Sequence, residues 1–209
     1  MRADASWGVE CAWPAAATKL RASRLWLYVA VLLLAAGGWQ FGRGAWIHAK
    51  AWLAQGLIAH AWSRTLSGES EVKPWSWADT WPVARLSVPR LGIERYVLAG
   101  DDGAGMAFGP GHVRSTAVPG AAGNSVIGGH RDTHLAFLRE LRTGDTLVVE
   151  RPDGARISYR VRWAEVLDRR EIWVAKQEGP ARLTLVTCYP FDALRAGGPL
   201  RYVVVALAG

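Results

Sequence analysis

Residues 182–201 read RLTLVTCYPFDALRAGGPLR, and this stretch decides the predicted fold of the second half of the chain. Its first seven residues combine β-branched and apolar side chains and end at Cys188, which is typical of a buried strand. A loop rich in proline and glycine follows, and a second apolar run, 202–207, begins directly after Arg201. If the two runs pair as antiparallel neighbours, Cys188 and Arg201 meet at one rim, with Cα atoms about 4.5–5.5 Å apart.

Short strand-like segments, separated by glycine and proline, fill the chain from residue 83 onward. They are 83–88, 94–98, 124–127, 146–150, 157–166, 183–187 and 202–207. One short helical turn is predicted at 135–141, before a Thr-Gly stop. This pattern predicts an all-β fold, a closed or nearly closed barrel of seven to eight strands with a short helix.

Ten of the twelve tryptophans of the whole chain precede residue 82, so the first part differs in composition from the rest. Residues 46–62 have helical spacing and predict a second, amphipathic helix ahead of a Trp-rich linker. We therefore expect four parts. They are a cytoplasmic segment 1–24, a transmembrane signal anchor 25–41, a helix and linker 42–82, and a barrel domain 83–209.

The anchor is predicted because residues 25–41 carry no charge over 17 residues, the short end of what crosses a bilayer. Lys19, Arg21 and Arg24 precede it, and the positive-inside rule then places the N-terminus in the cytoplasm. A cleavable signal peptide is the alternative, since Ala35-Ala36-Gly37 resembles a cleavage site. In both cases the barrel lies outside the cytoplasm, and we favour the uncleaved single-pass anchor.

Charge and cysteine content narrow the functions open to this chain. The net charge is +7, but no basic run is interleaved with aromatic residues, so we expect no nucleic-acid partner. We favour a generally basic, Arg-rich surface as the explanation of this charge, and binding to anionic lipid or cell-wall polymer is the alternative. The two cysteines, Cys11 and Cys188, are expected on opposite sides of the membrane, which leaves Cys188 unpaired.

His130 follows a predicted strand and a Gly-Gly pair, so it is expected at the same end of the barrel as Cys188 and Arg201. These three groups suffice for acyl transfer. A thiolate attacks a carbonyl, the imidazole moves protons, and a guanidinium stabilises developing negative charge. Arg195, in the same loop, is the alternative to Arg201.

The string TLVTC at 184–188 matches the TLxTC signature of sortases, the membrane-anchored cysteine transpeptidases of bacteria. Gly129-His130-Arg131 resembles the histidine segment of that family, and Arg201 matches its arginine. The strings GHRDTH and CYPF look most like the sortases of Gram-negative bacteria, whose catalytic domain lies in the periplasm on an inner-membrane anchor.

The resemblance implies cleavage of a C-terminal sorting signal of the Leu-Pro-x-Thr-Gly kind in a target protein. A thioester forms, and an amine acceptor takes the acyl group. It implies that Cys188 is the nucleophile, His130 the general acid and base, Arg201 the oxyanion or substrate stabiliser, and that Thr187 contacts the substrate.

Two other classes of function stay open. An L,D-transpeptidase or another cell-wall cysteine hydrolase would share the thiol, but no Ser-x-Gly-Cys-like segment surrounds Cys188. A membrane-tethered binding module would have an incidental cysteine. No metal or cofactor is expected, because His130 and His134 have no nearby third ligand and no EF-hand loop is present.

Overall fold

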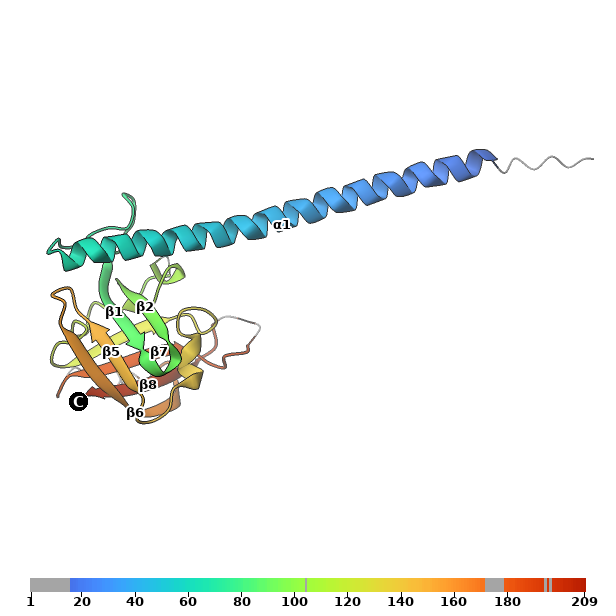
Figure 1. Cartoon of the computed structure of the whole chain (residues 1–209). Coiled ribbons are helices and arrows are strands. Elements are labelled where there is room, and N and C mark those ends of the chain that lie inside the picture. Colours follow the sequence, from blue (N-terminus) through green and yellow to red (C-terminus); the bar gives the residue numbers. More distant parts are fainter. Residues whose placement is uncertain (1–15, 104, 172–178, 194, 196) are drawn as a thin grey trace, which may run out of the picture. The chain divides into compact units, whose positions relative to one another are not determined.

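The structure is a computed structural model and describes residues 16–103, 105–171, 179–193, 195 and 197–209. A helix, α1 (Ala16–Leu66), comes first, and strands follow it (Figure 1). The strands are β1 (Pro82–Val88), β2 (Ile93–Ala99), β3 (Gly111–His112), β4 (Asn124–Gly129), β5 (Thr146–Glu150), β6 (Arg156–Asp168), β7 (Arg182–Cys188) and β8 (Leu200–Ala208). The short 3-10 helices are η1 (Pro89–Leu91), η2 (Gly105–Ala107) and η3 (Ala136–Glu140).

The strands form a closed barrel in the order β1-β2-β3-β4-β7-β8-β6-β5, and β5 pairs with β1 to close it. This confirms the predicted barrel, and each of the seven predicted strands is present. Strand β3 was not predicted, because its two residues are too few to show an alternating pattern. It requires Gly111, since a Cβ there would lie 2.1 Å from the carbonyl oxygen of Gly100.

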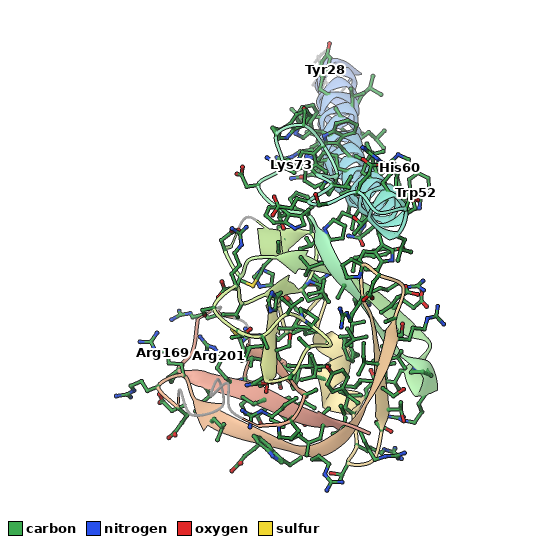
Figure 2. All side chains as sticks on the ribbon, turned by 90° about the vertical axis from the view of Figure 1, so that its left-hand side faces the viewer. Tyr28, Trp52, His60, Lys73, Arg169 and Arg201 are labelled. Atoms are coloured by element: carbon green, nitrogen blue, oxygen red, sulfur yellow. The ribbon has the colours of Figure 1, made fainter. Side chains whose placement is uncertain are left out.

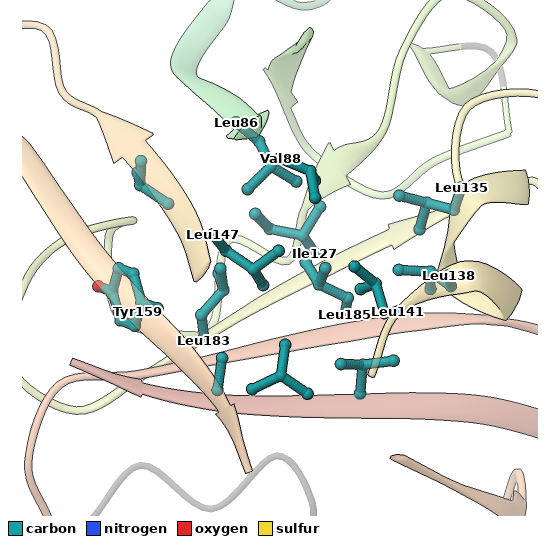
Figure 3. Packing of buried hydrophobic residues seen from close by; sticks show 14 of the residues in the cluster. Leu86, Val88, Ile127, Leu135, Leu138, Leu141, Leu147, Tyr159, Leu183 and Leu185 are labelled. Carbon is teal, nitrogen blue, oxygen red and sulfur yellow. The ribbon is translucent and has the colours of Figure 1, made fainter. Parts of the chain in front are cut away.

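The interior of the barrel is filled by aliphatic side chains from all around the sheet, with the aromatic ring of Tyr159 at one side (Figure 3). Leu183 and Leu185 of β7 are completely buried there. Burying a leucine side chain contributes about 1.5–3 kcal/mol relative to exposure. The apolar run that ends at Cys188 is therefore held in place by the core, which fixes the position of the thiol.

Glu150 ends β5 and joins the strands that close the barrel. Its side chain is 10% exposed, and its two carboxylate oxygens accept hydrogen bonds from Arg85 Nε at 2.7 Å and Arg156 Nε at 3.0 Å. Both arginines are its direct cross-strand partners in the register. Burial raises the pKa of Glu150, but the hydrogen bonds and charges of the two arginines outweigh it and hold the pKa below the usual 4.5.

Glu150→Gln should lower the free energy of unfolding at neutral pH by about 1–3 kcal/mol, because it weakens two charge-assisted hydrogen bonds. A carboxylate with a depressed pKa stabilises the fold above its unfolded pKa and stops doing so as pH falls through its folded pKa. The difference between wild type and variant should therefore shrink below about pH 4.5. Urea unfolding at pH 7 and pH 3.5 measures this, and a pH-independent difference would contradict it.

The prediction of two separate helices was wrong, because α1 is continuous from Ala16 to Leu66. No proline interrupts it, and glycines such as Gly37 and Gly38 lower helix stability by about 1 kcal/mol each without removing a backbone hydrogen bond. The described part of the chain holds no helix that meets the length and hydropathy required to cross a bilayer.

The chain divides into two compact units, Met1–Lys50 and Ala51–Gly209, so the last turns of α1 belong to the unit that contains the barrel. In these turns Ala54, Ile58 and Trp62 are buried, and Gln55 Nε2 donates to the carbonyl oxygen of Phe108 at 2.7 Å. The second compact unit is therefore larger than the domain predicted from residue 83.

Candidate active site

Cys188 ends β7, the strand that lies between β4 and β8 in the barrel. Its side chain is partly buried and is a free thiol. Cys11 lies outside the described residues. The thiol is therefore at the end of a strand in which four of the other six side chains are buried.

Arg201 is the direct cross-strand partner of Cys188 in the antiparallel pair of β7 and β8. The predicted pairing of these two strands is confirmed. The guanidinium Nη1 donates hydrogen bonds to the carbonyl oxygens of Gly198 at 2.7 Å and Leu200 at 2.9 Å. Figure 2 labels Arg201 near Arg169, where β6 ends and β8 begins. These bonds restrict the orientation of the guanidinium.

His130 directly follows β4, which runs parallel to β7, and Gly129 is the register partner of Thr187. Continuing this register by one residue brings His130 alongside Cys188. The imidazole is exposed, so a ligand at this end of the barrel can reach it. Three neighbouring strands thus bring thiol, imidazole and guanidinium to one end of the barrel, although up to 71 positions separate them in the chain.

Gly129 is required here for packing rather than for bending. A Cβ at this position would lie 2.8 Å from Leu135 Cγ, and Leu135 is completely buried. The amide of Leu135 also donates to the carbonyl oxygen of His130 at 3.0 Å. The segment after His130 therefore folds back tightly over the end of β4, and Gly129 permits this close approach.

Thr187 is 2% exposed, and its hydroxyl donates to the carbonyl oxygen of Gly129 at 2.7 Å. This bond joins β7 to the residue that precedes His130. The contact is internal to the barrel, and the predicted contact of Thr187 with substrate stays a prediction.

His134 lies four residues after His130, and its ring contacts a backbone carbonyl. Its Nε2 lies 3.3 Å from the carbonyl oxygen of Ala107. Burial lowers the pKa of His134, and its hydrogen bond to Ala107 only partly offsets this. A neutral imidazole that donates to a carbonyl follows from both observations. Among the described residues, no three His, Cys, Asp or Glu side chains are grouped as metal ligands.

Comparison with known families decides the identity of this fold. The model of the Sortase domain family matches residues 86–208, more than half of the chain. The chain belongs to the sortase family. The match begins within β1 and ends at the last residue of β8, so it covers the whole barrel of this sortase except the first four residues of β1.

Several sortases resemble this one over the barrel. Sortase D of Bacillus subtilis is 29% identical over 120 residues, which is 57% of this chain and 60% of that protein. The chain thus matches less than two thirds of that relative's length. The solved catalytic domain of B. anthracis SrtD is 33% identical, with a TM-score of 0.53, over 61% of this chain and 87% of that one.

A Clostridium perfringens Sortase D5 transpeptidase is 25% identical, with a TM-score of 0.54, over 62% of this sortase and 79% of that chain. Sortase A from Corynebacterium diphtheriae, 20% identical with a TM-score of 0.57, shares the fold over 75% of this chain and 84% of its own. These relatives lend no support to the predicted place among the Gram-negative sortases.

Proposed function

We propose that this sortase is a cysteine transpeptidase that cleaves a C-terminal sorting signal and transfers the acyl part to an amine. The observation that carries the proposal is the register that sets Cys188 opposite Arg201, with His130 directly after the neighbouring strand β4. Membership in the sortase family supplies the reaction type. The proposed signal is of the Leu-Pro-x-Thr-Gly kind, cut between threonine and glycine.

The proposed first step starts from the Cys188 thiolate and protonated His130. Sγ bonds to the threonine carbonyl carbon, the C–N bond to glycine breaks, and His130 gives its proton to the leaving nitrogen. A thioester remains. In the second step an amine bonds to the same carbon, the C–S bond breaks, and His130 takes a proton from the amine. Thiolate and protonated imidazole are thereby restored.

Arg201 has the role of stabilising the negative charge on the carbonyl oxygen in both steps. Its Nη1 is engaged by two backbone carbonyls, which fix the plane of the group. A guanidinium has five N–H donors, so others remain for the substrate. Its charge is present at any working pH.

Arg201→Lys should lower kcat/KM by about 10²–10³, because an ammonium cannot replace the planar donor set at the oxyanion. The matched control is Arg195→Lys in the same loop, which should change kcat/KM less than about threefold. Peptide cleavage kinetics on both variants measure this. A larger loss in the Arg195 variant would assign the oxyanion role to Arg195 instead.

The reaction is tested with the full chain in detergent, a Leu-Pro-x-Thr-Gly peptide and a glycine-based amine. We expect release of the glycine-led fragment and a new amide between the acyl part and the amine. The same protein is incubated with muropeptides. Turnover of muropeptides in place of the sorting peptide would favour an L,D-transpeptidase or another cell-wall hydrolase.

We also propose that residues 25–41 anchor the protein in the cytoplasmic membrane, with the N-terminus inside and the barrel outside. In a Gram-negative cell, which GHRDTH and CYPF favour, these are the inner membrane and the periplasm. In support, the segment has no charge, and apolar side chains such as Leu32 and Leu34 are exposed. The helical backbone continues beyond both ends, so its hydrogen bonds are satisfied.

Alkaline extraction of cell membranes tests the anchor, and we expect the protein to stay in the pellet. Leu33→Arg, which places a charge at the middle of the segment at a cost of about 2.5–3.5 kcal/mol, should shift protein to the soluble fraction. A mature N-terminus beginning near Gly37 would instead show a cleaved signal peptide.

A further inference from the structure

The segment that follows His130 also holds the loop that follows Cys188. Arg131 Nη2 donates to two carbonyl oxygens of the β7–β8 loop, that of Ala193 at 2.8 Å and that of Arg195 at 2.8 Å. Both acceptors lie between Cys188 and Arg201 in the chain. The guanidinium of the residue after His130 is thus hydrogen-bonded to the loop that connects Cys188 with Arg201.

Arg131 is 8% exposed, an uncommon position for a charged side chain. In the part of the chain that the structure describes, no carboxylate pairs with it, and its observed acceptors are backbone carbonyls. A buried charge without a carboxylate partner is costly and gains little for general stability. Its two hydrogen bonds instead restrict the path of the backbone at Ala193 and Arg195.

A second arginine from the same segment contacts the same loop. Arg139 of η3 lies with its Cζ 5.6 Å from the centroid of the Phe191 ring. Phe191 packs edge-on against Tyr202 of β8, with ring centroids 5.2 Å apart. The start of the β7–β8 loop is therefore held against both η3 and the strand that carries Arg201.

We propose that Arg131 is a positioning residue that holds the β7–β8 loop in the conformation in which it binds the acyl donor. The loop-holding role rests on the geometry alone, and the link to the acyl donor rests on the proposed function. A residue that shapes the binding surface without touching the reacting atoms affects KM more than kcat.

The first test is hydrogen exchange of the full chain without substrate, comparing wild type with Arg131→Met. Methionine keeps an unbranched chain and removes both donors. We expect amide exchange across 189–199 to rise at least tenfold, while exchange in β4 and β7 changes less than threefold. Arg142→Met, an exposed arginine beyond η3, is the matched control and should leave the loop unchanged.

The second test measures kinetics with the sorting peptide. Arg131→Met should raise KM about 10–100-fold, as expected for losing two hydrogen bonds from a charged donor, and change kcat less than threefold. Arg131→Lys keeps the positive charge and hydrogen-bond donors, so the rise in log KM should be at most half of that in Arg131→Met. It also serves as the second variant if Arg131→Met does not fold.

The outcomes separate this proposal from the reaction proposed above. If wild type does not act on the peptide, the proposed function fails, and the exchange experiment still decides the loop-holding role. Unchanged loop exchange in Arg131→Met, or an equal rise across the barrel, would overturn that role. Faster loop exchange with an unaltered KM would overturn the link to the acyl donor.

Discussion

Cys188→Ala should abolish peptide cleavage and amine transfer, with a loss on the order of 10⁴ or more in kcat. The thiol is the only group at this end of the barrel proposed to form the covalent intermediate, and alanine cannot form one. Because Cys188 ends β7 and is only partly buried, the substitution should shift the thermal midpoint by less than ~4 °C. Product analysis by liquid chromatography measures the loss.

The matched control for this prediction is Val186→Ala, which alters a side chain of the same strand that is partly buried like Cys188 and has no assigned role. It should retain most of the activity. If Cys188→Ala anchors its target as well as wild type does, the cysteine is incidental and the protein is a membrane-tethered binding module.

His130→Gln should lower kcat by about 10²–10⁴, the usual contribution of a positioned general acid and base. Glutamine keeps a polar side chain but cannot exchange a proton near neutral pH. KM should change much less, because the proposed role of His130 is in the proton transfers and not in binding. Steady-state kinetics on the sorting peptide separate the two parameters.

His134→Gln is the matched control, since it alters the neighbouring histidine, whose Nε2 faces the carbonyl of Ala107. A glutamine amide can still donate to that carbonyl, so the loss should be less than about tenfold. If this variant loses as much kcat as His130→Gln, the assignment of the base to His130 is contradicted.

The barrel could be predicted from the sequence because each predicted strand is a short run of β-branched and apolar residues between glycines and prolines. The position of Cys188 opposite Arg201 followed from two adjacent runs and the loop between them, and the register confirms it. The alignment of His130 with Cys188 was harder to foresee. It depends on the parallel pairing of β4 with β7, which are 53 residues apart between the end of one and the start of the other.

Other features depended on tertiary contacts that no local pattern encodes. The apolar spacing at 46–62 predicted a separate helix. The glycines before it do not interrupt the helical backbone, so the segment is part of one continuous helix, α1. Within this segment Leu53 is 56% exposed, whereas Ala54 and Ile58 are buried. Because only four of the 17 residues of this segment are polar or charged, the pattern did not specify which face packs.

Arg131 shows why part of the site was not predicted. Its sequence position marks it only as the neighbour of His130, and its acceptors are backbone carbonyls of Ala193 and Arg195, which have no signature in the sequence. Only the path of the β7–β8 loop brings them within reach. Hydrogen bonds to backbone, unlike ion pairs, leave no complementary residue to find.

The central claim is that Cys188 carries the acyl group, and mass spectrometry of the trapped enzyme tests it most directly. The full chain is mixed with a sorting peptide without amine, quenched in acid and digested. The account predicts a thioester on the peptide that contains Cys188, with the mass of the fragment ending in threonine, and loss of this adduct when an amine is added. Cleavage of the sorting peptide with no adduct on Cys188 at any time, together with full activity of Cys188→Ala, would contradict it.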